Sequence, residues 1–210
     1  LEEIPSGIIA WNSEGKIILA NSTALSLLGF EQLVFVRQLK QLYPESNIRV
    51  SGFEEIPEKE QNSYDVIASN IPFGDTSIFD LSYSRSRETA KVQASRSIHN
   101  YFFLKGADML REGGLLAYIT SQGILNSPNN EPIRRALMQD NNLVSVVRLP
   151  NNLFTEYAGT EVGSDLIILQ KNSGKNGELY YNEKLFVQTE QTPIGTSVNG
   201  YVWSIGSLSH

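Results

Sequence analysis

The segment YDVIASNIPF, residues 64–73, is the stretch of this 210-residue sequence that decides its fold. Its first six residues predict a buried strand, because apolar residues follow one another without the strict alternation of a half-exposed strand. Asn70 follows with no intervening linker, and Pro72 cannot donate a ladder hydrogen bond and so ends the strand. A polar residue just past the carboxyl end of a buried strand is where an α/β sheet usually places a ligand site.

The segments around this strand alternate between strand and helix patterns. We expect strands over residues 7–11, 17–20, 48–53, 115–119, 143–149 and 166–169, and helices over residues 24–28, 99–111 and 132–138, with a turn over residues 112–114. Strands that alternate with helices indicate an α/β fold with a mainly parallel sheet. A long loop joins the last two strands, and this pair can close the sheet as an antiparallel edge.

Composition excludes several kinds of site. The chain has no cysteine, which excludes disulfides, thiolate metal sites and cysteine nucleophiles, and with two histidines we expect no metal site. It has no apolar run of about 18 residues, so we expect no membrane span, and it shows no signal peptide, so we expect a cytoplasmic protein. Its formal net charge of -6 does not attract DNA, so any DNA contact requires a local basic patch or another subunit.

Residues 70–73 combine groups that suit chemistry on the N6 amine of an adenine. This amine is a poor nucleophile because its lone pair is delocalised into the ring. Two acceptors on its hydrogens favour the tetrahedral nitrogen of a transition state, and the Asn70 side chain and the Ile71 carbonyl can provide them. Pro72 fixes the turn, and Phe73 can stack on a base that has left the duplex. A tight strand-to-loop turn of an ordinary α/β protein is the structural alternative.

These four residues resemble the Asn-Pro-Pro-Phe/Tyr motif of methyltransferases that act on adenine. Ile71 departs from the first proline of that motif, which need not abolish a role of its backbone carbonyl. The order and spacing of further segments resemble the bacterial DNA methylases of mobile elements, some fused to helicases, which are related to type I restriction-modification subunits. The resemblance spans residues 39–172 and rests on segments 52–55, 64–75, 98–103, 110–121, 148–154 and 158–165.

The resemblance implies a Rossmann-like methyltransferase sheet, S-adenosylmethionine as cofactor and DNA as substrate. It assigns the catalytic turn to Asn70, Ile71, Pro72 and Phe73, and it admits a further methylase or helicase segment or subunit as partner. In that family a glycine-rich loop on an upstream strand holds the methionine part of the cofactor. No such loop is recognisable before Leu39, and no Gly-x-Gly occurs in the chain. We therefore expect a fold that is incomplete in its N-terminal half, and doubtful independent cofactor binding.

Glu54 is the candidate for the acidic residue near the cofactor adenine, although a solvated strand end explains it equally well. Residues 5–35 resemble the start of a PAS sensor domain, since two short strands flank a Glu-Gly turn and a short helix follows. Residues 172–177 are polar and predict a linker. These features divide the chain into a PAS-like segment over residues 1–38, a methylase region over residues 39–172, and a linker with a C-terminal extension over residues 173–210.

The segment after the catalytic turn is locally basic. The segment holds four basic residues, Arg85, Arg87, Lys91 and Arg96, and one acidic residue, Glu88. The basic side chains can contact DNA phosphates. A mobile, solvated loop without DNA is the alternative. His99 opens a helix and is more readily structural than catalytic, because this methyl transfer needs no strong base.

Three hypotheses follow. The first is an enzyme that transfers a methyl group from S-adenosylmethionine to adenine N6 in DNA. The second is a non-catalytic remnant or fusion of that fold that serves in DNA binding or assembly. The third is a PAS-like sensory or dimerisation module.

Overall fold

A computed structural model describes residues 7–11, 17–20, 40–46, 52–72, 76–150 and 163–207. Six strands form one sheet in the order β2-β1-β3-β4-β6-β5. Their bounds are β1 Gly7–Trp11, β2 Ile17–Ala20, β3 Tyr64–Asn70, β4 Leu110–Ser121, β5 Asn141–Arg148 and β6 Ser164–Lys171. The strands expected around residues 7–11, 17–20, 64–69, 115–119, 143–149 and 166–169 are all present.

Strand direction confirms the α/β prediction and refines it. Strands β3 and β4 are parallel neighbours, and the other four neighbouring pairs are antiparallel. It follows that β2, β3, β4 and β5 all point in one direction, and that β1 and β6 run against them. The last pair, β5 and β6, closes the sheet as an antiparallel edge, as expected. The sequence did not indicate that β6 lies inside the sheet, between β4 and β5. The chain enters β6 at the same end of the strands at which it leaves β5, so the two strands run antiparallel.

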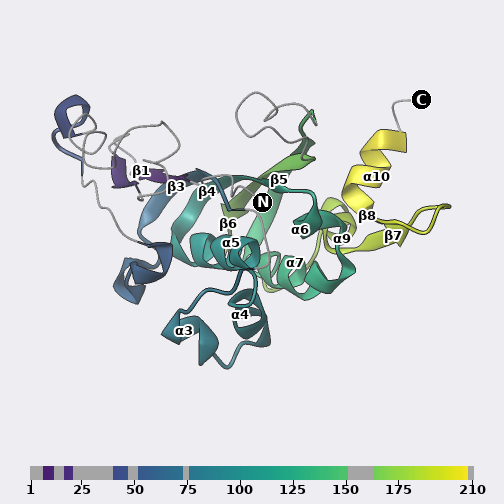
Figure 1. Ribbon diagram of the computed structural model, residues 1–210, viewed down its shortest axis with the longest axis horizontal. Coiled ribbons are helices and arrows are strands. Elements are labelled where there is room, and N and C mark those ends of the chain that lie inside the picture. Colours follow the sequence, from purple (N-terminus) through teal and green to yellow (C-terminus); the bar gives the residue numbers. More distant parts are fainter. Residues whose placement is uncertain are drawn as a thin grey trace.

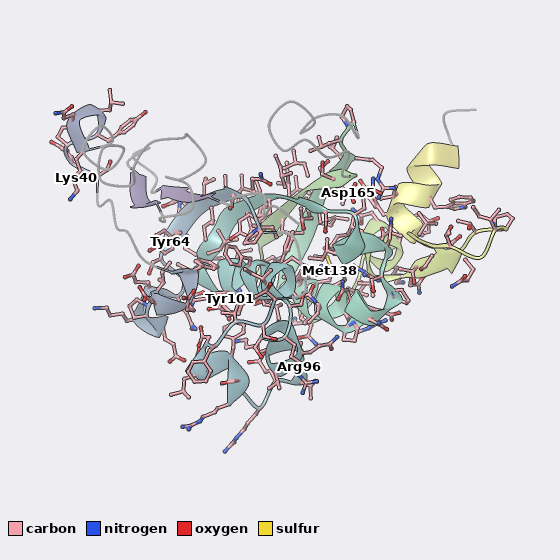
Figure 2. The ribbon with its side chains drawn as sticks, in the orientation of Figure 1. Lys40, Tyr64, Arg96, Tyr101, Met138 and Asp165 are labelled. Carbon is pink, nitrogen blue, oxygen red and sulfur yellow. The ribbon has the colours of Figure 1, made fainter. Side chains whose placement is uncertain are left out.

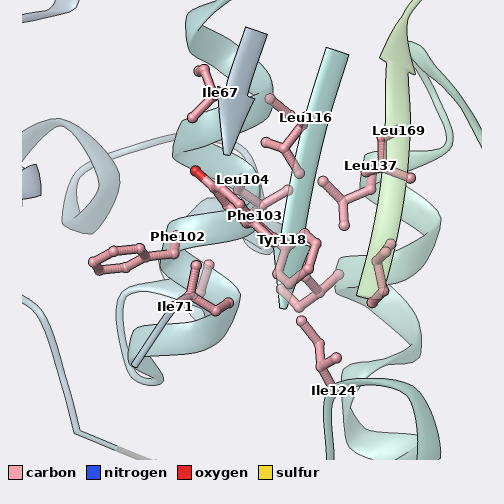
Figure 3. Close-up of a cluster of buried hydrophobic side chains, with 14 of the residues drawn as sticks. Ile67, Ile71, Phe102, Phe103, Leu104, Leu116, Tyr118, Ile124, Leu137 and Leu169 are labelled. Atoms are coloured by element: carbon pink, nitrogen blue, oxygen red, sulfur yellow. The ribbon is translucent and has the colours of Figure 1, made fainter. Parts of the chain in front are cut away.

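The helices that cross between strands lie on one side of the sheet (Figure 1). The longest is α5, Ile98–Met109, which joins β3 to β4, while α6, Gly123–Asn126, and α7, Glu131–Leu137, join β4 to β5. Leu137 and Ile124 meet Tyr118 and Leu116 in the hydrophobic core that Figure 3 shows. Helix α5 is buried along nearly its whole length because two short helices, η1, Phe53–Glu55, and α4, Thr89–Ala94, cover the side that faces away from the sheet. No helix in the described ranges is long and apolar enough to cross a membrane.

Two local predictions need correction. Phe53–Glu55 forms a short 3-10 helix, η1, where the end of a strand was expected, and residues 48–51 lie outside the described residues. Residues 112–114 are no turn after a helix, because α5 ends at Met109 and β4 begins at once. They form an irregularity within β4, where Gly113 adopts a φ of 76° and the register against β3 shifts.

The basic segment is also ordered. It forms two short helices, α3 from Leu81 to Ser84 and α4 from Thr89 to Ala94, where a mobile loop was the expectation. The buried side chains of Tyr83 and Ala94 anchor them to the domain. The sequence concealed this because a few buried side chains suffice to fix such short helices.

The C-terminal region packs against the domain through α9, Tyr181–Val187, the two-stranded ribbon of β7, Thr189–Gln191, and β8, Ser197–Asn199, and α10, Gly200–Ser207. Residues 173–177, expected as a linker, form a turn whose Lys175 is buried. Its Nζ lies 2.6 Å from Glu183 Oε1 and donates to the carbonyl of Asn141 at 2.7 Å. This turn therefore belongs to the packed structure. The boundaries at residues 38 and 172 stay predictions, although β1 pairs directly with β3.

Candidate active site

Asn70 is the last residue of β3, at the carboxyl end of the two parallel strands. It pairs in register with Ile119 of β4, and the next amide, Ile71 N, donates to the Ile119 carbonyl at 3.0 Å. The Ile71 side chain is fully buried under the helix layer, while Asn70 points to the opposite face and is only partly buried. The pairing of β3 with β4 thus fixes the backbone at Asn70 and Ile71.

Three buried polar side-chain atoms near the carboxyl ends of β3 and β4 have no hydrogen-bond partner in the described residues. Within the described residues, Asn70 Oδ1 is a buried acceptor without a hydrogen-bond partner, and so are the hydroxyls of Thr120 and Ser164. Thr120 lies at the end of β4 and Ser164 at the start of the adjacent β6. Buried polar atoms are nearly always paired in folded proteins, so the unpaired Asn70 oxygen is available to a ligand. The Thr120 side chain lies on the other face of the sheet, with Leu116 and Tyr118. Pro72 is partly buried, and Phe73 lies outside the described residues.

A buried ion pair fixes the segment that follows the turn. Lys105 of α5 donates from Nζ to Asp80 Oδ2 at 2.8 Å and to the Glu54 carbonyl at 3.1 Å. Asp80 also accepts from the Tyr101 hydroxyl at 2.6 Å and caps α3 through the amide and hydroxyl of Ser82. Burial alone would raise the pKa of Asp80, but the hydrogen bonds from Lys105, Ser82 and Tyr101 outweigh it and hold the pKa well below its usual range.

Sequence reasoning missed Asp80 and Lys105. The signals were an aspartate directly before the short helix at residue 81, where an N-cap is expected, and a lysine inside an otherwise apolar helix. Only the fold shows that these two residues meet. The arrangement ties together three segments: the end of the loop after the turn, the η1 segment of Glu54, and the middle of α5.

Glu54 and Asp80 are therefore linked through Lys105 of α5. The Glu54 side chain is exposed, and it lines an open hollow together with Asp80, Ser82 and Arg85. This position leaves the carboxylate free to face a ligand. Glu54 as a contact to the cofactor adenine stays a prediction.

The described residues do not supply a complete cradle for S-adenosylmethionine. Their glycines with positive φ are Gly113, Gly177 and Gly195, and none follows the carboxyl end of a strand in this sheet. A glycine loop that cradles the cofactor would need such a position.

The four basic candidates do not form one surface. Lys91 is committed within the chain, since its Nζ lies 3.0 Å from Asp108 and 3.3 Å from Glu88. Its pKa is raised: burial lowers it, and the two carboxylates, Asp108 foremost, more than compensate. Arg85 and Arg87 are exposed in the α3–α4 region, near the end of α5 that leads into the start of β4. Arg96 is exposed just before α5, beside α4 in Figure 2.

His99 behaves as a structural residue. It is buried in the first turn of α5, and its ring lies 3.0 Å from the Ser97 hydroxyl. The loop over residues 151–162, which could cover the cofactor or the base, lies outside the described residues.

A family model, N-6 DNA Methylase, matches residues 42–194. The chain belongs to this family. The match covers well over half of the 210 residues, and it extends past residue 172 into the segment that packs through Lys175 and Glu183. The recognised region of this N-6 DNA methylase family member therefore includes α9 and β7.

Two named proteins are similar to this chain in sequence. The chain is 26% identical over 141 residues to the Defense against restriction protein B of Escherichia phage P1, which is 65% of this chain and 6% of that protein. It is 26% identical over 127 residues to the Type I restriction enzyme MpnII methylase subunit of Mycoplasma pneumoniae, which is 58% of this chain and 23% of that subunit. The chain thus spans less than a quarter of the length of either relative.

One solved structure shares the fold. The M protein of the type I restriction enzyme EcoKI superposes with a TM-score of 0.55 at 21% identity, over 70% of this chain and 30% of that protein. This likeness confirms the Rossmann-like methyltransferase sheet that the sequence predicted.

Proposed function

We propose that this N-6 DNA methylase family chain carries the catalytic turn of an enzyme that methylates adenine N6 in DNA, with S-adenosylmethionine as methyl donor. One observation carries the proposal. Asn70 Oδ1 is a buried acceptor without a partner in the described residues, at the carboxyl end of β3. Buried acceptors are usually paired, so the unpaired Asn70 oxygen at the carboxyl end of a strand is available to accept from a ligand.

The chemistry follows from the geometry of the turn. Asn70 accepts one hydrogen of the N6 amine, and the Ile71 carbonyl is proposed to accept the other. The two bonds strengthen as nitrogen becomes tetrahedral, so they lower the barrier more than they tighten binding. In the transfer, the N–C bond would form as the S–C bond of the donor breaks and S-adenosylhomocysteine is released. The extra proton on the amine nitrogen would then leave to water, because no strong base is required. Phe73 is proposed to stack on the base after it leaves the duplex.

Contacts to DNA and to the cofactor are proposed to involve residues outside the turn and a further segment or subunit. Arg85, Arg87 and Arg96 remain candidates for phosphate contacts, while Lys91 serves α4 through Asp108. Because the formal net charge of the chain is -6, we propose that a basic partner supplies further phosphate contacts. A further methylase segment or subunit is proposed to supply the cofactor loop. Glu54 is proposed to contribute one contact to the cofactor.

The Asn70→Ala variant tests the proposal. The full chain is assayed for transfer of a labelled methyl group to adenine in duplex DNA, with millimolar S-adenosylmethionine so that weak cofactor binding does not limit the rate. We expect turnover to fall by about a hundred- to thousand-fold, by analogy with loss of one preorganised polar contact, and DNA affinity to stay within a few-fold. Asn142→Ala, an asparagine of β5 that is no part of the turn, is the matched control.

Equal turnover of Asn70→Ala and the original chain would make the turn structural and the mechanism wrong. If the original chain, assayed together with the further segment proposed to supply the cofactor loop, transfers no methyl group at all, the proposed activity is wrong and a non-catalytic member of the family that acts in DNA binding remains.

A further inference from the structure

The chain contains two Asn-Gly pairs, Asn176–Gly177 and Asn199–Gly200. Such a pair is chemically reactive, because the backbone amide of the glycine can attack the side-chain carbonyl carbon of the asparagine and close a five-membered ring. A glycine favours the attack, since it has no Cβ to keep its backbone at a distance. The surroundings of each pair decide whether it can react in the folded chain.

The first pair lies in an exposed turn between β6 and α9. Asn176 and Gly177 are its central residues, with φ of 53° and 74°, and the Glu178 amide closes the turn by donating to the Lys175 carbonyl at 3.4 Å. A Cβ at Gly177 would meet no atom within 4 Å. Within the described residues, the Asn176 side chain makes no hydrogen bond and the Gly177 amide donates none. Both reacting groups are therefore accessible.

The second pair is held by hydrogen bonds on both of its reacting groups. Asn199 is fully buried, and its Nδ2 donates to the carbonyls of Phe186 at 2.7 Å and Gln188 at 3.1 Å. Its Oδ1 accepts from the Tyr201 amide at 3.1 Å. The Gly200 amide, which would have to attack, donates to the Gln188 carbonyl at 3.1 Å. The same two residue types are thus protected at this position.

Asn62 provides a second comparison. Among the described residues other than glycine, only Asn62 shares the positive φ of Asn176, with a value of 55°, and it is also exposed. The residue that follows it is Ser63, whose amide donates to the Met109 carbonyl at 2.9 Å. Asn62 therefore shares the exposure and backbone conformation of Asn176 but not the accessible glycine amide.

We propose that Asn176 is a site of spontaneous deamidation in the folded chain, and that its conversion loosens the contacts that hold the start of β5. The Gly177 nitrogen bonds to Asn176 Cγ while the bond from Cγ to Nδ2 breaks, and the proton of the glycine amide leaves with Nδ2 as ammonia. Water then opens the ring at either of its two carbonyls. The products are aspartate and isoaspartate at position 176, and each carries a negative charge that asparagine lacks.

The expected effect on β5 follows from the residue that precedes this asparagine. The buried Nζ of Lys175 lies 2.6 Å from Glu183 Oε1 and donates to the Asn141 carbonyl at 2.7 Å. Isoaspartate routes the main chain through the side-chain carbons, which adds one backbone carbon at position 176. This changes the length of chain that connects Lys175 to Glu183, so the fit of the buried pair is lost and the start of β5 is held less firmly.

Peptide mass spectrometry of the full chain tests the site. The folded protein is kept at physiological temperature and mildly alkaline pH, and conversion of each Asn-Gly pair is followed over time. We expect Asn176 to convert at least about ten-fold faster than Asn199, since Asn199 can react only through local opening of its buried hydrogen bonds. In concentrated urea both pairs should convert at similar rates. The rate at Asn176 should rise with pH, because the attacking nitrogen must lose its proton.

Two variants separate this reaction from other changes on storage. Asn176→Gln keeps an amide but needs a six-membered ring, so conversion at this position should stop. Asn62→Gln is the matched control and should leave conversion of Asn176 unchanged. Thermal unfolding of fresh and aged samples of each chain measures the effect on the fold. On ageing, the midpoint should fall in the original chain and in Asn62→Gln, and it should stay constant in Asn176→Gln.

Intact Asn176 in the folded chain, after a time in which the urea-treated chain has converted, overturns the proposed site. Equal conversion of Asn176 and Asn199 in the folded chain overturns it as well, because the surroundings of the pairs then do not decide. A converted chain with the original midpoint overturns the proposed effect on β5. Methyl transfer enters none of these readouts, so failure here is distinct from failure of the proposed methylation.

Discussion

Lys105 sits in the middle of a buried helix, and its charge is held by one carboxylate. Its side chain and that of Asp80 are 9% and 7% exposed, and their atoms lie 2.8 Å apart. Replacing a buried ion pair with apolar residues is often tolerated, but removing one partner leaves an uncompensated charge. Lys105 also bonds to the Glu54 carbonyl, so its loss frees two segments at once.

We expect Lys105→Met to lower the free energy of unfolding by about 3–5 kcal/mol, measured by urea denaturation at pH 7. The double variant Lys105→Met with Asp80→Asn should recover part of this loss, because it removes the buried charge that has no counterion. Arg135→Met is the matched control: Arg135 is paired with Glu131 on the surface, and its loss should change stability by less than about 1 kcal/mol. Equal effects of Lys105→Met and Arg135→Met would show that the buried pair does not matter to the fold.

Among the elements, α5 packs closely against β4 at Gly106. A Cβ on Gly106 would lie 2.4 Å from the Tyr118 hydroxyl and 2.6 Å from Leu116 Cδ1. Both neighbours are fully buried, and Phe103 packs edge-on against the Tyr118 ring at 5.1 Å. A methyl group at residue 106 must therefore push the helix away from the strand.

Gly106→Ala should destabilise the chain by about 1–3 kcal/mol, as overpacked cores do. The higher helix propensity of alanine, about 1 kcal/mol, opposes this loss and should not reverse it. Tyr118→Phe removes the hydroxyl, which is buried without a partner in the described residues, and should by itself be nearly neutral or stabilising. Combined with Gly106→Ala it should restore part of the loss. A double-mutant cycle by chemical denaturation measures the coupling, and strict additivity of the two changes would contradict the proposed clash.

For the whole molecule, the C-terminal region closes the core at β5. Glu183 Oε1 accepts from the Leu143 amide at 3.1 Å, and the Lys175 ammonium reaches the Asn141 carbonyl. Both ionic side chains are at most 2% exposed. The backbone at the start of β5 therefore depends on hydrogen bonds from residues that follow position 172.

Truncation after residue 172 should lower the midpoint of thermal unfolding and make β5 accessible to proteolysis, because the backbone of Asn141 and Leu143 loses buried partners. Removal of residues 208–210 is the matched control and should leave the midpoint unchanged. Differential scanning calorimetry and limited proteolysis measure the two effects. A truncated chain with the original midpoint would support the boundary at residue 172 that the sequence predicts.

The sequence by itself determined the elements whose signals are local. The apolar run before Asn70 predicts β3, the run at residues 115–119 predicts the centre of β4, and Pro72 ends the first of them. The family followed from the Asn-Ile-Pro-Phe turn and the spacing of the segments around it. These features depend on neighbours in the chain, so a reader of the sequence can find them.

Tertiary structure decided what joins distant positions. It brought Lys105 to Asp80 and Glu54, Lys175 to Glu183, and Lys91 to Asp108, pairings that no spacing reveals because each lysine could reach many carboxylates in an unfolded chain. It placed β6 inside the sheet, and it placed the helices α5, α6 and α7 of the later crossovers on one side of it. The physical reason is that pairing order and handedness are properties of the packed sheet, whereas periodicity in the sequence reports only whether a segment has a face to bury.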